Sequence, residues 1–153
     1  MPIAGSWDTK SGGKLKVLFG IDMPTLQEKY LQFGDKTNPE DTDTRGLRAY
    51  MVSNIPKNSI GAMEWHKNRN ELVFALSGKV EWKCEDTQGS VETFTLDESN
   101  GVWNPPYILH TYRALDDNCT LLVIANTLFI PDNPETHDSY SQDSFRELQL
   151  HGL

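Results

Sequence analysis

Two histidines and two glutamates are the residues of this chain whose types and spacing suggest chemistry. Glu64 and His66 are two residues apart in a stretch with strand-like alternation, so their side chains should share one face while Trp65 points to the other. Glu71 opens the next expected strand, and His110 follows a double proline much later. If they converge, two imidazoles and two carboxylates suit a divalent metal. They suit proton transfer equally well, because histidine titrates near neutral pH and burial shifts a carboxylate toward it.

Short strands between turns are the elements expected to position these side chains. From residue 47 onward, runs rich in Val, Leu, Tyr, Phe and Trp alternate with clusters of Gly, Pro, Asn and Asp. Such regular spacing, without helical periodicity, is typical of a β-sandwich or barrel. The expected strands are residues 47–54, 60–66, 71–76, 79–85, 91–96, 102–104, 110–115 and 120–126.

The flanking segments predict smaller elements around a single domain. A chain of 153 residues fits one domain with a core of its own. We expect the barrel to lie within residues 45–130. The other expectations are a loose arm over residues 1–13, a short strand over 14–19, a helix over 23–33, a loop over 34–46, and a tail over 131–153 with a helix over 140–150.

The composition excludes several classes of partner. The net charge is −8 and the pI is about 4.9, so the surface is a poor partner for nucleic acid or an anionic membrane. No apolar run approaches the ~18 residues of a membrane span, and the first residues lack a secretion signal, so we expect a cytoplasmic protein. Cys84 and Cys119 stand far apart without a CxxC pair, which predicts free thiols.

Two stretches resemble the paired motifs of the cupins. Residues 64–78 (EWHKNRNELVFALSG) resemble the first motif, H-x-H-x4-E-x6-G, with Glu64 in place of the first histidine and the leading Gly61 closer than usual. Residues 105–110 (PPYILH) resemble the second motif, P-x-G-x2-H, with Tyr107 in the glycine position. The resemblance implies an all-β, single-domain cupin, a double-stranded β-helix or jelly-roll barrel with short terminal helices and the site inside.

A narrower resemblance is to the sugar 3,4-ketoisomerases, cupins that act on dTDP-4-keto-6-deoxyhexoses without a metal. It rests on Arg48-Ala49-Tyr50, Ile55-Pro56, the EWHK run at 64–67 and the residues around His110, and it extends over residues 45–147. The resemblance implies that His66 and Tyr50 are catalytic, that Arg48 meets the substrate and that no cofactor is needed. The family's Arg-Gly pair ahead of a His-x-His run is replaced here by Ile60-Gly61, with Glu64 following.

A second resemblance links residues 123–136 (VIANTLFIPDNPET) to the C-terminal cupin domain of capsule-sugar reductases. It implies a bound metal, with a glutamate at the Glu71 position. Under this hypothesis a divalent ion (Zn²⁺, Mn²⁺, Ni²⁺ or Fe²⁺) is bound by Glu64, His66, Glu71 and His110. Both resemblances imply a nucleotide sugar as substrate and a role in polysaccharide biosynthesis.

Glu64 needs a partner if it faces inward. A carboxylate buried alone costs several kcal/mol, so we expect Arg48 or Arg113 to meet it, or a proton or a metal to neutralise it. Trp103, just before the double proline, is placed to stack on a base or sugar ring, and Tyr112 and Arg113 are further expected substrate contacts.

Three functions remain open at this point. The first is an isomerase or epimerase in which His66 is the base, Glu64 orients it or is itself the base, Tyr50 donates to the enolate and Arg48 meets a diphosphate. The second is a metal enzyme acting on a small molecule, and the third is a cupin that binds a sugar without catalysis. Resemblance to small cupins also implies a homodimer, formed by exchange of the strand at 14–19 onto an open sheet edge.

Overall fold

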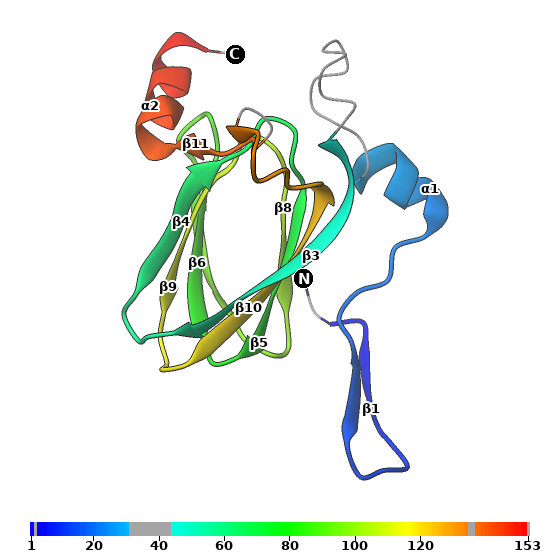
Figure 1. Ribbon diagram of the computed structural model, residues 1–153. Helices are drawn as coiled ribbons and strands as arrows, with labels where there is room; N and C mark the ends of the chain where they lie inside the picture. Colours follow the sequence, from blue (N-terminus) through cyan, green and yellow to red (C-terminus); the bar gives the residue numbers. More distant parts are fainter. Residues whose placement is uncertain (2, 31–43, 135–136, 153) are drawn as a thin grey trace.

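The computed structural model describes residues 1, 3–30, 44–134 and 137–152, and its body consists of two facing β-sheets (Figure 1). One sheet has the order β3-β10-β5-β8 and the other β11-β4-β9-β6-β7, with antiparallel pairing throughout. Successive strands mostly alternate between the sheets, which confirms the predicted all-β jelly roll. The strands are β3 (Arg45–Ile55), β4 (Ile60–Trp65), β5 (Glu71–Ser77), β6 (Val80–Glu85), β7 (Val91–Leu96), β8 (Gly101–Asn104), β9 (Leu109–Ala114), β10 (Cys119–Thr127) and β11 (Tyr140–Ser141).

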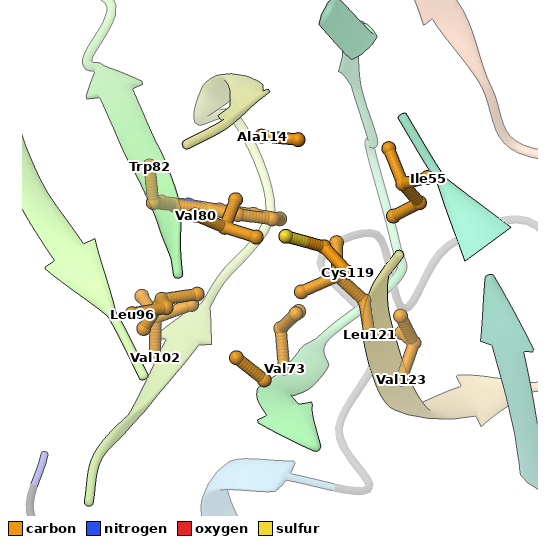
Figure 2. Packing of buried hydrophobic residues seen from close by; sticks show 11 residues of the cluster. Ile55, Val73, Val80, Trp82, Leu96, Val102, Ala114, Cys119, Leu121 and Val123 are labelled. Carbon is orange, nitrogen blue, oxygen red and sulfur yellow. The ribbon is translucent and has the colours of Figure 1, made fainter. Parts of the chain in front are cut away.

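Apolar side chains from both sheets fill one end of the space between them (Figure 2). Val73 of β5, Trp82 of β6 and Leu121 of β10 are 0%, 3% and 2% exposed. Burying a side chain of this size contributes about 1.5–3 kcal/mol, so this cluster is the main source of apolar stabilisation. The two sheets are therefore fixed against each other at this end.

The inward-facing positions change from apolar to polar along the strands. On β5, alternation sends Ala75, Val73 and Glu71 to the inner face in turn. On β9, the same alternation sends Ala114 and then His110 inward. The end of the sandwich opposite the apolar core is thus lined by groups that can bind or transfer protons.

Terminal segments pack against the outside of both sheets. Residues 18–26 lie on the outside of the first sheet, where Phe19 stacks on Phe74 of β5 with ring centroids 5.8 Å apart. Helix α2 (Gln142–His151) lies at one end of the second sheet, next to β11, and places the fully buried Phe145 against Trp65, the last residue of β4 (Figure 1). This confirms the helix predicted near the end of the chain.

The N-terminal region agrees with the prediction only in part. The expected strand over 14–19 is present as β2 (Lys14–Val17), but the expected loose arm contains a further strand, β1 (Gly5–Asp8), which pairs with β2 in a hairpin that projects away from the two sheets (Figure 1). A helix does begin at Met23, as α1 (Met23–Thr25) followed by a π-helical turn, η1 (Leu26–Tyr30). The rest of the expected helix and most of the loop expected over 34–46 lie outside the described residues. None of the helices in the described ranges is long and apolar enough to cross a membrane.

Gly78, the last residue of the first motif, is fixed by its turn and its neighbour. It has φ +72°, and a Cβ atom there would lie 2.5 Å from the Sγ of Cys119. A larger residue is therefore excluded both by conformation and by packing. Cys119 and Cys84 are both free thiols, as predicted.

Candidate active site

Glu71 lies at the centre of the polar end, where it is 3% exposed. The phenol of Tyr50 donates a hydrogen bond to its Oε1 at 3.0 Å, and Nη1 of Arg69 lies 3.4 Å from the same oxygen. The Nε2 atoms of His66 and His110 lie 3.6 and 3.7 Å from its Oε2. Four side chains, two from strands β3 and β9 and two from the turn between β4 and β5, thus converge on one carboxylate.

These neighbours decide the charge of Glu71. Burial alone would raise its pKa, but His66, His110 and Arg69 outweigh burial and hold the pKa of the carboxyl well below its usual value. Glu71 is therefore ionised at neutral pH. It accepts hydrogen bonds and orients its partners, and it is too weak a base to remove a proton from carbon.

Glu64, His66 and His110 form the group that could hold a metal ion. One ligand atom from each residue lies within 4.8 Å of the other two, and Glu71 is outside this group of three. Glu64 pairs with His110 across β4 and β9 after a break in register, where Ala62 and Met63 both have positive φ (62° and 60°). Such a bulge re-aims the side chain that follows it, here Glu64.

Trp65 points away from this group, as alternation predicts. Its ring packs on the outer side against Tyr140, with centroids 4.8 Å apart, and against Phe145 at 5.9 Å. The side chains before and after it, Glu64 and His66, consequently face the inside.

His110 is held by residues that the sequence did not single out. Its Nδ1 lies 2.8 Å from Nδ2 of Asn104 and 3.2 Å from the carbonyl oxygen of Ile108, and its ring stacks on Trp82 at 5.6 Å. Burial lowers the pKa of His110 and outweighs the opposing charge of Glu71, so the imidazole is neutral at neutral pH. Accepting from Asn104 leaves Nδ1 without a proton, whereas donating to Ile108 requires one. The rotation of the Asn104 amide therefore sets the tautomer of His110.

A pocket of about 400 Å³ adjoins Glu71 and opens to solvent. It is lined by Arg48, Tyr50, Arg69, Phe129, His137 and Ser139. The guanidinium of Arg48 lies over the rings of Tyr50 and Phe129, 5.1 and 5.3 Å from their centroids. In the described part of the chain, the buried Nε atoms of Arg48 and Arg69 have no hydrogen-bond partner, whereas the other nitrogens of Arg69 contact Glu71 and the carbonyl of His137.

Two of the expected substrate contacts lie outside this site. Trp103 is on the outer face of the first sheet with Leu72, and its Nε1 donates to Oδ1 of Asn70 at 3.0 Å. Arg113 is exposed on the outer face of the second sheet, where it forms an ion pair with Glu81 at 3.1 Å. Alternation is the reason, because Asn104 and Tyr112 take the inward positions next to them.

The other expected contacts do lie on the inner side. Tyr112 is half buried there, with its ring stacked 6.3 Å from that of Trp82. Arg48 and Tyr50 line the pocket. Arg69 was not among the predicted site residues, although its place between His66 and Glu71 in the motif was a usable signal.

A family model described as "FdtA: WxcM-like, C-terminal" matches residues 21–144 of the chain. The fold is similar to that of QdtA, a sugar 3,4-ketoisomerase from Thermoanaerobacterium thermosaccharolyticum, with a TM-score of 0.66 and 17% identity over 99% of this chain and 95% of that one. WlaRA, a TDP-fucose-3,4-ketoisomerase from Campylobacter jejuni, gives a TM-score of 0.56 and 21% identity over 67% of this chain and 73% of that one.

The second expected resemblance also has a structural counterpart. CapF, a capsular polysaccharide assembling protein from Staphylococcus aureus, matches with a TM-score of 0.52 and 18% identity, over 64% of this chain and 26% of that one. No curated protein sequence matches the chain. At identities this low, the likenesses to solved structures establish the cupin-like fold alone.

Proposed function

Because the chain belongs to the FdtA family of WxcM-like C-terminal domains, we propose that it is an isomerase acting on a nucleotide-linked 4-keto-6-deoxy sugar. One observation carries the proposal. The buried Nε2 of His66 has no hydrogen-bond partner among the described residues and lies near Glu71, which itself contacts two residues of the arginine-lined pocket. Proton transfer on a sugar nucleotide needs an imidazole nitrogen that is free of hydrogen bonds and lies next to a pocket for the diphosphate.

The reaction requires a base for the carbon acid at C3 and a donor for the oxygen at C4. His66 takes the C3 proton at Nε2, and the electron pair forms an enediolate. Return of a proton to C4, with the hydroxyl proton moving from O3 to O4, gives the 3-keto isomer without a cofactor. Glu64 orients His66 or replaces it as base. Burial and then the charge of Glu71 raise the pKa of Tyr50, so the phenol keeps its proton and acts as the donor when it exchanges its hydrogen bond to Glu71 for one to the sugar oxygen.

The pocket supports a diphosphate-bearing substrate. Arg48 and Arg69 supply two guanidinium groups, which suit phosphate oxygens in geometry and charge. Solved structures of QdtA contain TDP in one case and TDP-4-keto-6-deoxyglucose in another. The overall charge of −8 makes such a local basic pocket necessary for an anionic ligand.

Hydrogen exchange at C3 tests the proposal directly. In deuterated water the protein should replace the C3 proton of dTDP-4-keto-6-deoxyglucose with deuterium. Proton NMR measures this exchange as the loss of the C3 proton signal. Saturable binding without exchange would favour the non-catalytic sugar-binding alternative. Neither binding nor exchange, at protein concentrations where an active ketoisomerase converts the substrate, would contradict the proposal.

A metal enzyme is the second candidate, supported by the group of Glu64, His66 and His110. Two imidazoles, a carboxylate and one open position suit Zn²⁺, which when bound would polarise a carbonyl oxygen. Metal-stripped protein should then unfold at a higher temperature when Zn²⁺ is added. At a Zn²⁺ concentration 100 times Kd, the free energy of unfolding should rise by about 2.7 kcal/mol. The variants Glu64→Gln and His66→Gln should lose this response. An unchanged unfolding temperature in the wild type would remove this candidate.

We further propose a cytoplasmic homodimer. The two free thiols support a reducing compartment. β3 is an edge strand of its sheet, and the β1–β2 hairpin projects from the body, so the hairpin of one protomer is available to the open edge of another (Figure 1). A single species of 17.3 kDa in sedimentation velocity at micromolar concentration would contradict the dimer.

A further inference from the structure

Asp138, in the tail between β10 and β11, binds the turn that joins His66 to Glu71. Its Oδ1 accepts a hydrogen bond from the backbone N–H of Lys67 at 2.9 Å. Its Oδ2 accepts from the backbone N–H groups of Asn68 and Arg69 at 2.9 and 2.8 Å. One carboxylate thus satisfies three successive donors, more than 60 residues away in the sequence, and fixes the path of the turn.

The main chain of the same residue contacts His66. The carbonyl oxygen of Asp138 lies 2.6 Å from Nδ1 of His66, which is 1% exposed. A carbonyl oxygen can only accept, so Nδ1 carries a proton. In the neutral imidazole the lone pair then belongs to Nε2, the nitrogen that faces Glu71 and has no hydrogen-bond partner in the described ranges.

Neighbouring contacts hold Asp138 in an uncommon backbone conformation. It has φ 49°, in the left-handed region that aspartate tolerates better than most residues. On one side, the carbonyl of His137 accepts from Nη2 of Arg69, and the His137 ring stacks on Phe129 at 4.4 Å. On the other side, Oγ of Ser139 lies 3.5 Å from the same Arg69 nitrogen. Positive φ is maintained here because the surroundings over-determine it.

We infer that Asp138 is a positioning residue that fixes His66 in the Nδ1–H tautomer and so leaves Nε2 free to accept a proton. The Asp138 carboxylate binds the backbone of the turn after His66, and these bonds hold the Asp138 carbonyl against the imidazole of His66. The expected effect on turnover rests on the proposed function, whereas the tautomer does not. The tautomer can therefore be tested even in a protein without isomerase activity.

Nitrogen NMR of ¹⁵N-histidine-labelled protein distinguishes the tautomers of the four histidines, with His66 assigned by its absence in His66→Gln. The wild type should show a protonated Nδ1 and a bare Nε2 at His66. Asp138→Ala should populate the other tautomer and lower kcat by roughly 10–100-fold with a smaller change in KM. Asp132 is an exposed aspartate of the same tail, so Asp132→Ala should leave the His66 tautomer and kcat unchanged.

Asp138→Asn covers the case in which Asp138→Ala fails to fold. Asparagine tolerates the same φ and keeps one acceptor oxygen, so it should show a smaller shift in tautomer population in the same direction. A wild-type His66 protonated at Nε2 would overturn the inference. So would a folded Asp138 variant in which the His66 spectrum and kcat match the wild type. If the wild type shows the expected His66 tautomer but no C3 exchange, the result would contradict the proposed function and leave the inference about Asp138 intact.

Discussion

The substitution His66→Gln should lower the rate of C3 exchange by about 10²–10⁴-fold, the usual contribution of a positioned general base. Glutamine is neutral, cannot take a proton at neutral pH, and is close enough in length to keep a contact with the Asp138 carbonyl. The pocket residues Arg48 and Arg69 are untouched, so substrate affinity should change little. Initial rates of deuterium incorporation over a range of substrate concentrations separate kcat from KM.

His151→Gln is the matched control. His151 is exposed on α2, where its only recorded contact within the described chain is with Glu147 at 3.4 Å, so its loss should leave exchange unchanged.

Glu64→Gln decides between the two roles left open for Glu64. If Glu64 only orients His66, this variant should retain measurable exchange that His66→Gln lacks. Near-normal exchange in His66→Gln together with loss in Glu64→Gln would make Glu64 the base.

The strands and the shared face of Glu64 and His66 could be predicted because alternation is a local property of the chain. Turn residues mark the ends of each run, and within a run every second side chain points the same way. Periodicity does not reveal which of the two faces points inward. Trp103 and Arg113 were therefore assigned to the substrate, although Asn104 and Tyr112 occupy the inner positions beside them.

Other features of the site depend on contacts that no local pattern encodes. Asp138 reaches His66 through a backbone carbonyl, a group that every residue carries, and across 72 residues of sequence. Asn104 meets His110 only because β8 and β9 lie in opposite sheets whose inner faces converge at the polar end. Strand β1 was missed for a different reason, although its partner β2 was predicted: β1 is short, and nearby glycines concealed its alternation.

The fold and the motif spacing leave the reaction open because Glu64 fits both proton transfer and metal binding. The tautomer of His110 separates the two. A metal needs a bare Nε2 on both His66 and His110, so Nδ1 of His110 must then donate to Ile108. Proton transfer is compatible with the alternative, in which Asn104 donates to Nδ1 and Nε2–H points to Glu71. The same nitrogen spectrum that tests His66 therefore bears on this choice.

Glu71→Gln should destabilise the fold by about 3–5 kcal/mol at neutral pH, because removing one partner of a buried ion pair leaves the other charge uncompensated. Arg69 is 4% exposed and would lose its carboxylate, while the Tyr50 phenol would keep an acceptor in the glutamine oxygen. At roughly 2–4 °C per kcal/mol for a domain of this size, the unfolding temperature should fall by at least about 6 °C. Urea unfolding followed by tryptophan fluorescence gives the free energy directly.

The pH dependence of this loss has a definite sign. The pKa of Glu71 in the folded state lies below its usual value of 4.5, so its contribution is fully present above that value and is lost as the pH falls through the folded pKa. The difference between wild type and Glu71→Gln should therefore be constant around neutral pH and shrink in acid. Glu81→Gln removes an exposed pair with Arg113 and should cost less than about 1 kcal/mol. Equal losses from Glu71→Gln and Glu81→Gln at neutral pH would show that Glu71 is not the ionised centre of this site, and the orientation of both imidazoles would then need another cause.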